Sequence, residues 1–251
     1  MKIVITGASS GIGFQLAKRY LEKGHVVGLI SRRIEMLEHF EKGWPESCRI
    51  YRADVRDLHA LQRAAMDFIS RFGCPDLVIA NAGISAGTLA HPAEDIGTFQ
   101  LIFDTNVIGM AKTFQPYVEE MKRKGGGTLV GIASVAGFRG LPGASAYSSS
   151  KAAVINYLEG IRAELYGTGI KVIAICPGYV ETPMTEVNPY PMPFLLKADA
   201  AAEKIMKAVS RGKSFYTFPW QMRMVGIVLR MLPSRIHAFL FSKAPRKPRI
   251  R

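Results

Sequence analysis

Near its amino terminus the chain reads Lys2-Ile3-Val4-Ile5-Thr6-Gly7-Ala8-Ser9-Ser10-Gly11-Ile12-Gly13. An apolar run typical of a β-strand leads into three glycines spaced G-x3-G-x-G, and a helical pattern follows. Such glycines permit a tight turn and a close approach of the backbone to a pyrophosphate, while the helix amino terminus adds N–H donors and the positive end of its dipole. The stretch predicts a dinucleotide-binding turn, and the alternative is a glycine-rich turn that binds nothing.

Short apolar runs alternate with longer helical patterns along the first 218 residues. This alternation is typical of βαβ units, whose helices cover both faces of a parallel sheet. We expect strands at residues 2–6, 25–31, 49–53, 76–80, 128–133, 170–176 and 214–218, and helices at 12–23, 33–42, 57–72, 98–124, 147–167 and 198–210. The predicted fold class is α/β: a single Rossmann-type, doubly wound domain of about seven parallel strands over residues 1–218, followed by a basic amphipathic helical extension over 219–251.

The charge of the chain is concentrated near its carboxyl end. The 251 residues are 48% hydrophobic and 21% charged, which suits one globular domain, and the net charge is +13. Glu203 is the last acidic residue, and twelve of the 33 basic residues follow it, which leaves 21 basic against 20 acidic residues elsewhere. This distribution favours a local anionic partner over a globally basic protein.

The cysteines and histidines form no pattern that is typical of a disulfide framework or a metal site. The three cysteines lack CxxC spacing and the five histidines are scattered, so we expect no metal. An apolar strand follows Met1 at once, which leaves no room for the charged and apolar regions of a signal peptide. We expect a cytoplasmic setting, with attachment to the inner face of a membrane as an alternative.

The second expected strand ends in Ser31-Arg32-Arg33. An NAD-specific site of this architecture usually places a carboxylate here for the ribose hydroxyls, whereas the 2′-phosphate of NADP needs cations. Ser31 and Arg32 supply no carboxylate and one guanidinium, so the sequence favours NADP over NAD. Arg33 either joins Arg32 at the phosphate or is a solvated charge.

Tyr147 and Lys151 lie four residues apart in a helical pattern and therefore project from the same face. A free phenol has a pKa of about 10, and a neighbouring ammonium favours the phenolate. Lowering this pKa by about 3 units would take about 4 kcal/mol of differential stabilisation. The bare Y-x3-K pattern is expected about 0.5 times by chance in a chain of this composition, so its neighbours must decide its meaning.

Ser134 ends an apolar strand pattern, thirteen residues before Tyr147. Ligands of open α/β sheets bind beyond the carboxyl ends of the strands, so this hydroxyl could face a cofactor and donate a hydrogen bond to a substrate carbonyl. In the alternative interpretation it only satisfies backbone groups in a turn.

Taken together, these motifs resemble the short-chain dehydrogenase/reductase family. The matching features are Thr6-Gly7-x3-Gly11-Ile12-Gly13, Asn81-Ala82-Gly83, Asn106, Ser134, Tyr147-x3-Lys151 and Pro177-Gly178, in the family's order over about residues 2–218. The resemblance implies hydride transfer at the nicotinamide ring and a catalytic tetrad of Asn106, Ser134, Tyr147 and Lys151.

The tetrad residues have distinct roles by this resemblance. Tyr147 would exchange a proton with the substrate oxygen, and Ser134 would polarise the carbonyl. Lys151 would orient the ribose and favour the phenolate, and Asn106 would link Lys151 to solvent through water. The alternative for Asn106 is a structural residue that interrupts its helix.

The resemblance also implies the residues that bind the cofactor. Asp54 would meet the adenine, Asn81 to Gly83 would line the cofactor, and Val180 and Thr182 would meet the nicotinamide carboxamide. The full expected set is Gly7, Ser9, Ser10, Gly11, Ile12, Gly13, Arg32, Arg33, Asp54, Val55, Asn81, Ala82, Gly83, Tyr147, Lys151, Pro177, Gly178, Val180 and Thr182. One position departs from the pattern: NADP-linked members often carry Lys or Arg just before the second motif glycine, where this chain has Ser10. The NADP preference therefore rests mainly on Arg32.

Residues 183–197 form a proline-rich stretch where the family places its substrate lid. Four prolines stiffen this stretch, and its apolar members are Met184, Tyr190, Met192, Phe194 and Leu195. We hypothesise a bulky apolar substrate, such as a lipid-like or steroid-like carbonyl compound or alcohol. In the alternative interpretation the apolar residues only pack the lid.

After Trp220 an apolar helical pattern carries Arg223, Gly226 and Arg230 on one stripe, which Ser234 and His237 continue if the helix survives Pro233. The run is too short and too charged to span a bilayer. It could lie in a membrane interface, with Trp220, Phe239 and Phe241 as anchors and residues 243–251 near anionic head groups. The alternatives are a helix that covers the pocket or a subunit interface, followed by a disordered basic tail, and, least favoured, nucleic-acid binding.

The sequence thus predicts an NADP(H)-dependent oxidoreductase that interconverts a small-molecule carbonyl and a secondary alcohol. We expect a homodimer or homotetramer packed through the helices at 98–124 and 147–167. The competing hypothesis is a non-catalytic dinucleotide-binding module that its basic tail recruits to membrane or nucleic acid. A sugar-nucleotide epimerase or dehydratase is disfavoured, because the carboxyl-terminal portion is short for a substrate domain.

Overall fold

The computed structural model describes residues 1–249. Seven parallel strands form a sheet in the order β3-β2-β1-β4-β5-β6-β9. Their bounds are β1 Lys2–Thr6, β2 Val26–Ser31, β3 Cys48–Arg52, β4 Leu77–Ala80, β5 Gly127–Ile132, β6 Ile170–Pro177 and β9 Phe215–Phe218. The expected seven-stranded parallel sheet is confirmed, and each strand end lies within one residue of its predicted position.

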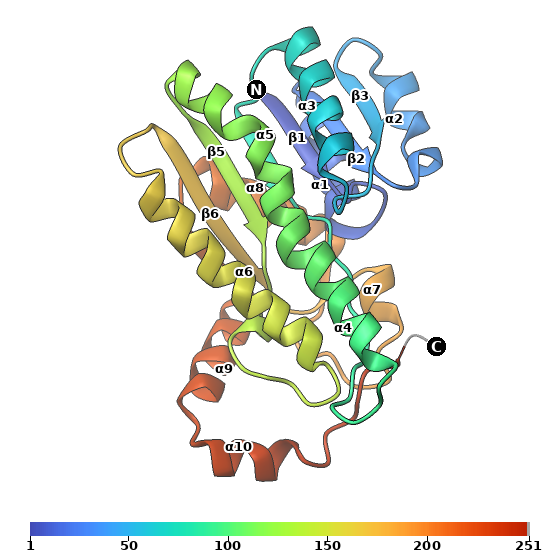
Figure 1. The fold of residues 1–251 in the computed structure, drawn as a ribbon, viewed down its shortest axis with the longest axis vertical. Coiled ribbons are helices and arrows are strands. Elements are labelled where there is room, and N and C mark those ends of the chain that lie inside the picture. The colour runs from blue at the N-terminus through green and yellow to red at the C-terminus, as the bar shows by residue number, and fades with distance from the viewer. Residues whose placement is uncertain (250–251) are drawn as a thin grey trace.

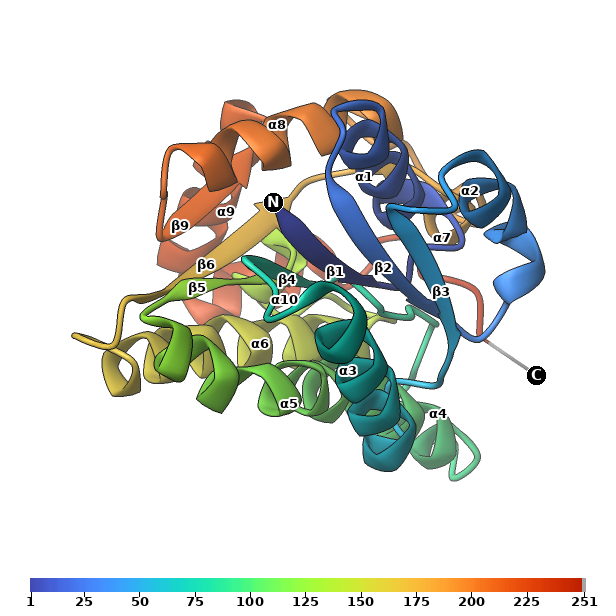
Figure 2. The same cartoon turned by 90° about the horizontal axis from the view of Figure 1, so that it is seen from above.

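Helices cover both faces of the sheet, as Figures 1 and 2 show. One face carries α1 Gly11–Glu22, α2 Glu38–Gly43 and α8 Ala198–Ser210, and the other carries α3 Leu58–Phe72, α5 Gly109–Lys124 and α6 Ser145–Glu164. Successive residues of a strand point to opposite faces, so Ile3 and Ile5 join the core under α1 and α8, while Val4 joins the core under α3 and α5. Both faces are therefore apolar, which explains the continuous apolar runs in the strands.

The order of the strands creates a crevice at one edge of the sheet. β1 pairs with β2 on one side and with β4 on the other, so the chain changes direction across the sheet at β1 and β4. Ligands of open α/β sheets bind at this switch point, outside the carboxyl ends of the strands. The fold therefore brings the glycine-rich turn after β1 next to Asn81, which follows β4.

The expected helix at 98–124 is not continuous. α4 Asp95–Phe103 passes through a π-helical turn at Asp104–Ile108 and continues as α5. The side chain of Asn106 in this turn binds the backbone of Ile84 outside the helix. Apolar periodicity predicts a helix here, but it cannot show that one turn contains the extra residue of a π-helix. The expected helix at 33–42 is also divided, into a 3-10 turn at Ile34–Met36 and α2.

The carboxyl-terminal region contains short elements around the lid that the periodicity did not predict, and the predicted helical extension follows them as two helices. The lid stretch holds the short helix α7 Pro183–Glu186 and the strand β8 Leu196–Lys197, which pairs with β7 Val180–Glu181 just before the lid. Two further helices follow, α9 Trp220–Met231 and α10 Ser234–Phe241, which are bent by 120° relative to each other. The helix therefore does not survive Pro233, which cannot donate a backbone hydrogen bond.

The residues of the predicted stripe on α9 differ in their exposure. Gly226 is buried against Phe138, and a Cβ at Gly226 would lie 2.2 Å from the ring of Phe138. Arg223 and Arg230, the other two residues of the stripe within α9, are exposed. Within the described residues no single helix has the length and apolar composition of a membrane span, and α9 and α10 reach those values only together across their bend.

The basic tail packs on the domain, so the alternative interpretation of a disordered tail is wrong for residues 246–249. The side chain of Lys247 is buried, and Arg249 forms ion pairs with Glu94 and Asp95. Ile250 and Arg251, which complete the segment 243–251 that was expected near anionic head groups, lie outside the described residues.

Candidate active site

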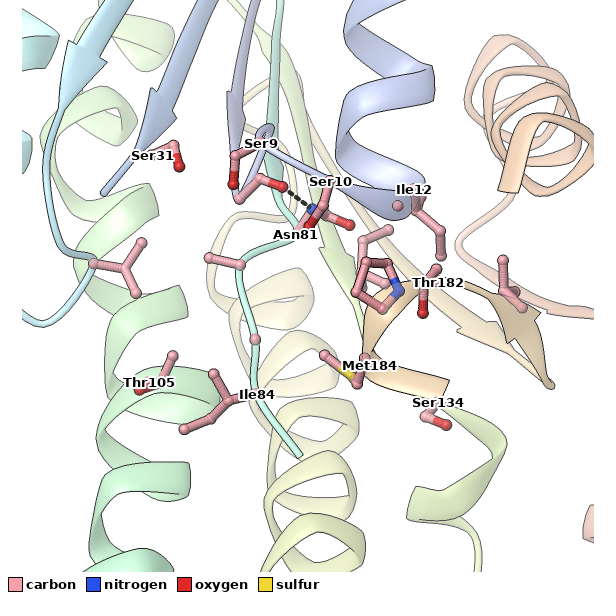
Figure 3. A pocket seen from close by; sticks show the side chains of 18 of the residues that line it. Ser9, Ser10, Ile12, Ser31, Asn81, Ile84, Thr105, Ser134, Thr182 and Met184 are labelled. Carbon is pink, nitrogen blue, oxygen red and sulfur yellow. Dashed lines mark hydrogen bonds between the residues drawn. The ribbon is translucent and has the colours of Figure 1, made fainter. Parts of the chain in front are cut away.

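A cleft opens at the carboxyl edge of the sheet, at the predicted switch point. Figure 3 shows Ser9 and Ser10 beside the start of α1, Ser134 after β5, and Thr182 and Met184 in the lid region. All residues of the expected catalytic and cofactor-binding sets line this cleft except Gly13 and Asn106. The topology therefore gathers motifs that are spread over more than 170 positions, from Gly7 to Thr182.

Asn81 braces the glycine-rich turn. Its Nδ2 donates to the carbonyl oxygens of Thr6 at 3.0 Å and Gly7 at 3.1 Å, and the Oγ1 of Thr6 accepts from the backbone N–H groups of Asn81 and Ala82 at 3.2 Å. A Cβ at Gly13 would lie 2.4 Å from the carbonyl oxygen of Gly7. Gly13 is therefore required so that α1 can pack against the turn, and it does not line the cleft.

The amino terminus of α1 faces the cleft with donors that suit a phosphate. Within the described residues the side chain of the N-cap, Ser10, makes no capping hydrogen bond, and the first turn contains no acidic residue. Gly7 and Gly11 adopt positive φ of 67° and 56°, and a Cβ at Gly7 would lie 2.7 Å from Cα of Ala82. The turn thus leaves backbone N–H groups and the helix dipole free to meet a pyrophosphate, and these residues fit a dinucleotide.

Two arginines stand at the end of β2 beside this turn. The guanidinium of Arg33 donates to the hydroxyls of Ser9 at 3.1 Å and Ser10 at 3.4 Å, and its backbone N–H donates to Ser31 at 3.1 Å. Arg32 is exposed beside it. Arg33 therefore brings a cation to Ser10, the position at which the sequence lacks one. Linear spacing could not show this contact, because the two segments meet only through the pairing of β1 with β2.

Asp54 follows β3 and lies among cations. Its carboxylate accepts from Arg56 at 2.8 Å and lies 3.9 Å from Arg32. The hydrogen bond from Arg56 is the largest cause that holds the pKa of Asp54 below its usual value. Asp54 therefore stays ionised at the cleft, and Arg56 is a neighbour that the motif did not predict. Across residues 1–249 no group of three or more His, Cys, Asp or Glu side chains is arranged to hold a metal.

Tyr147, Lys151 and Ser134 meet at the carboxyl end of β5. Lys151 lies one turn after Tyr147 on α6, with its Nζ 5.8 Å from the centre of the phenol ring, and it donates to the carbonyl oxygen of Ile132 at 2.8 Å. The Oγ of Ser134 accepts from the backbone N–H of Ala136 at 3.1 Å. Ser134 thus accepts a backbone hydrogen bond within its turn, and it also lines the cleft, so both interpretations of this residue apply.

Burial governs the ionisation of this group. Desolvation raises the pKa of Tyr147, and the hydroxyl of Ser134 only partly offsets the rise. Desolvation also lowers the pKa of Lys151 to about 8. Burial is the largest cause of the raised pKa of Tyr147, and the ammonium of Lys151, which donates to the carbonyl oxygen of Ile132, is not among the causes of this shift. The phenol is protonated, which is the form that can donate a proton.

Asn106 lies outside the cleft lining and contacts residues beside the site. Its Nδ2 donates to the carbonyl oxygen of Ile84 and to Oγ of Ser150, both at 3.0 Å, and its Oδ1 accepts from the N–H of Ile84 at 2.8 Å. A Cβ at Gly83 would lie 3.2 Å from this Oδ1 and 3.6 Å from Nζ of Lys151, so both side chains lie next to Gly83. The contacts of the Asn106 side chain match the structural interpretation.

The cleft also contains residues that the expected set did not include. They are Ile30, Ser31, Ala53, Ile84, Thr105, Ile132, Ala133, Pro183, Met184 and Thr185. Most could have been found by extending each motif to the end of its strand or into the lid, because the carboxyl ends of the strands form the wall. Thr105 gives no such signal, since only the π-helical turn brings it to the cleft.

The model of the short chain dehydrogenase family matches residues 1–190. The chain belongs to this family. Among its relatives, an uncharacterized oxidoreductase from Myxococcus xanthus is 36% identical and aligns over 98% of this chain and 96% of its own. The 2-(R)-hydroxypropyl-CoM dehydrogenase of Xanthobacter autotrophicus is 35% identical over 73% of this chain and 76% of its own. The 11-beta-hydroxysteroid dehydrogenase 1A of Arabidopsis thaliana is 31% identical over 86% and 68%. This short-chain dehydrogenase is therefore an enzyme, an oxidoreductase of small molecules.

Solved structures of short-chain dehydrogenases share the fold over nearly the whole chain. One from Burkholderia cenocepacia in complex with NADP has a TM-score of 0.82 at 25% identity and covers 96% of this chain and 99% of its own. The 3-ketoacyl-(acyl-carrier-protein) reductase of Brucella melitensis complexed with NADH has a TM-score of 0.79 at 25% identity, covering 86% and 96%. Both cofactors thus occur among its neighbours, and the family assigns a nicotinamide dinucleotide to this short-chain dehydrogenase.

Proposed function

We propose that this short-chain dehydrogenase uses NADP(H) to interconvert a bulky apolar carbonyl compound and its secondary alcohol. The observation that carries this proposal is the meeting of Tyr147, Lys151 and Ser134 in the cleft that begins at the glycine-rich turn. A non-catalytic dinucleotide-binding module would not need a half-buried phenol, a buried ammonium and a hydroxyl at one strand end.

Each residue has a role that follows from its position. Bound NADPH would supply the hydride to the carbonyl carbon. Tyr147 is kept protonated by burial and donates its proton to the carbonyl oxygen, while the hydroxyl of Ser134 polarises the same oxygen. Lys151 orients the ribose hydroxyls and stabilises the phenolate that remains. Asn106 holds Ile84 and Ser150 in place, and a water on its backbone would connect Lys151 to solvent.

The residues at the end of β2 support NADP over NAD. Arg32 is exposed at the cleft, Arg33 is fixed beside Ser10, and Ser31 stands where a carboxylate would bind the ribose of NAD. Two guanidinium groups suit a 2′-phosphate, because charge-assisted hydrogen bonds to phosphate are strong and often bidentate. The glycine-rich turn and the start of α1 would hold the pyrophosphate, and Val180 and Thr182 would meet the carboxamide.

The lid supports an apolar substrate. Met184 lines the cleft, and Phe194 and Leu195 remain 49% and 43% exposed on the lid. Large apolar side chains that were needed only to pack the lid would be buried, so their exposure favours contact with a substrate.

A substrate panel with both cofactors tests this proposal. NADPH oxidation is measured with small polar and bulky apolar carbonyl compounds and is repeated with NADH. We expect kcat/KM to be at least about tenfold higher for the bulky apolar compounds and for NADPH, since tenfold corresponds to about 1.4 kcal/mol. Replacing Arg32 and Arg33 by Ser should remove most of the NADPH preference, whereas Arg52→Ser, which removes an exposed arginine paired with Glu35, should not. Equal rates across the panel, or a preference for NADH, would contradict the proposal.

We also propose that α9 and α10 present a surface for an anionic membrane. Six large apolar side chains on these helices are more than half exposed, and we call them the α9–α10 surface: Trp220, Met224, Val228, Met231, Phe239 and Leu240. The exposed cations Arg223, Arg230 and Arg235 lie on the same helices, and no acidic residue follows Glu203. Anionic head groups complement such a surface, whereas a second copy would bring like charges together. Helices α9 and α10 form one end of the molecule in Figure 1, where a flat partner has access.

Vesicle flotation tests the α9–α10 surface. The wild type should float with vesicles that contain phosphatidylserine and should float less at high salt, because salt screens the attraction. Replacing Trp220, Met231 and Phe239 by Ser should abolish flotation, whereas Tyr166→Ser, which removes an exposed ring at the end of α6, should not. Equal flotation of wild type and triple variant would contradict the proposal. A smaller molar mass of the triple variant in solution, without any flotation of the wild type, would show that a second copy covers this surface.

For the oligomer we propose a homodimer or homotetramer packed through α4, α5 and α6. Ile96, Phe99 and Ile108 are exposed along α4 and the π-helical turn, on the outer side of this helical layer. Apolar side chains at these positions support an interface between copies of the chain.

A further inference from the structure

The last described residues form a strap across the carboxyl edge of the sheet. In Figure 1 the chain leaves α10 and returns toward α4 and α7. We call residues 245–249 the C-terminal strap. It contacts the loop after β4, the loop before α6, and the lid.

The loop after β4 is shaped to receive the strap. The N–H of Gly87 donates to the carbonyl oxygen of Pro248 at 2.8 Å, and Gly87 pairs with Arg249 in a parallel bridge. A Cβ at Gly87 would lie 2.1 Å from the carbonyl oxygen of Lys247. Any residue other than glycine at position 87 would therefore displace the strap.

The loop before α6 provides a second contact. A Cβ at Gly143, whose φ is 71°, would lie 2.7 Å from Cβ of Arg246. The carbonyl oxygen of Gly143 accepts from the N–H of Thr88 at 3.1 Å, so the two loops that receive the strap are joined. Tyr147 follows Gly143 by four residues in the first turn of α6. The strap therefore rests on the segment that positions the phenol.

Arg249 anchors the end of the strap. Its guanidinium donates to Asp95 and to Glu94 at 2.9 Å, and the buried carboxylate of Asp95 also accepts from the N–H of Leu89 at 2.7 Å. The hydrogen bond from Arg249 is the largest cause that keeps the pKa of Asp95 below its usual value. This anchor fixes the strap to the start of α4.

Lys247 connects the strap to the lid. Its side chain is only 8% exposed, and its Nζ donates to the carbonyl oxygen of Met184 at 3.1 Å. The side chain of Met184 lines the cleft, so this hydrogen bond fixes a residue of the substrate wall. A buried ammonium is unfavourable unless it is hydrogen-bonded, and here the contacts of Arg246, Pro248 and Arg249 hold it in place.

We propose that the C-terminal strap is part of the substrate site and that Lys247 is a positioning residue, which holds the lid closed against the end of the cleft that contains Tyr147. The inference rests on the proposed function for its kinetic consequence only. With the lid held in one position, binding of the substrate need not order this stretch, so the affinity for the carbonyl compound is higher.

Lys247→Met in the full-length, NADP-loaded protein tests the proposal, with Lys207→Met on the exposed face of α8 as the matched control. Hydrogen exchange of residues 183–197 should become at least about fivefold faster in Lys247→Met and should not change in Lys207→Met. The KM for the carbonyl substrate should rise about five- to tenfold with kcat changed less than about twofold, because a lost positioning contact weakens binding more than chemistry.

Gly87→Ala provides an independent variant, because it displaces the strap and leaves Lys247 in the chain. It should also speed exchange of residues 183–197, at a melting temperature close to that of the wild type. Wild-type exchange of the lid in both variants would overturn the proposal, and so would a lower kcat at unchanged KM. If no carbonyl compound is turned over, the proposed function fails, and hydrogen exchange alone still decides the role of the strap.

Discussion

At the scale of single residues, the site is governed by burial as much as by neighbouring charge. Lys151 stands close to Tyr147, yet its Nζ donates to the carbonyl oxygen of Ile132, and desolvation dominates the pKa of both groups. The spacing of a tyrosine and a lysine on a helix does not indicate how deeply either is buried. The spacing predicts that the two side chains lie together, but it does not predict the desolvation that raises the pKa of Tyr147.

The buried ammonium of Lys151 predicts a pH dependence of stability. Its pKa falls from an ordinary value of 10.5 to about 8, so between pH 8 and 10 the unfolded chain binds a proton that the folded protein does not. The free energy of unfolding contributed by Lys151 therefore rises with pH in this range, by about 1 kcal/mol per pH unit. Urea unfolding of wild type and Lys151→Met at pH 7.5, 8.5 and 9.5 measures this contribution of Lys151 to the free energy of unfolding.

The comparison with Lys151→Met isolates this group. Lys247 has a pKa of about 8 for the same reason, and it contributes equally to both proteins. The difference in unfolding free energy, wild type minus variant, should increase from pH 7.5 to 9.5. A difference that stays constant would show that Lys151 is not desolvated in the folded protein.

Other residues of the site show which kinds of inference the sequence supports. Residues fixed by a local turn or strand end, such as Ser10 and Ser134, could be predicted because their place depends on a few neighbours. Arg33 could not be settled, since its contact with Ser10 depends on the pairing of β1 with β2. Gly13, which was expected to bind the cofactor, instead allows close packing, because the carbonyl oxygen of Gly7 occupies the space where its side chain would lie.

At the scale of elements, the π-helical turn between α4 and α5 shows a limit of periodicity. The side chain of Asn106 makes three hydrogen bonds outside its own helix, two to Ile84 and one to Ser150. This turn brings Thr105 to the cleft, and π-helical turns are frequent at functional sites.

Asn106→Ala should destabilise the protein by about 2–3 kcal/mol, because it leaves the partly buried N–H and carbonyl of Ile84 without their side-chain partner. The measurement is urea unfolding, with Asn156→Ala on the exposed face of α6 as the control, for which we expect a change within about 0.5 kcal/mol. A decrease in unfolding free energy as small as that of the control would show that water replaces the Asn106 amide and that the π-helical turn does not depend on this side chain.

Helix α9 shows why an apolar pattern alone cannot orient a helix. Its sequence is apolar around most of the circumference, so the two arginines suggested where the polar stripe lies. The structure buries Gly226 because the ring of Phe138 needs its space, and the arginines face outward. The packing partner, which lies 88 positions earlier in the chain, decides the orientation.

At the scale of the whole molecule, the parallel sheet could be predicted because each of its elements carries its own signal. Apolar runs, glycine-rich turns and helical periods follow one another in an order that few topologies accommodate. The C-terminal strap carries no comparable signal. Its contacts join Lys247 to Met184 and Pro248 to Gly87, and only the complete fold brings these pairs together.

The proposed transfer of a proton from Tyr147 to the substrate during carbonyl reduction is tested by Tyr147→Phe. The measurement is NADPH oxidation with the best substrate of the panel, together with NADPH binding followed by fluorescence. Because a positioned general acid contributes about 10²–10⁴-fold, turnover should fall at least about 100-fold, while the Kd for NADPH stays within about twofold of the wild type. Turnover by Tyr147→Phe at the wild-type rate would contradict the account.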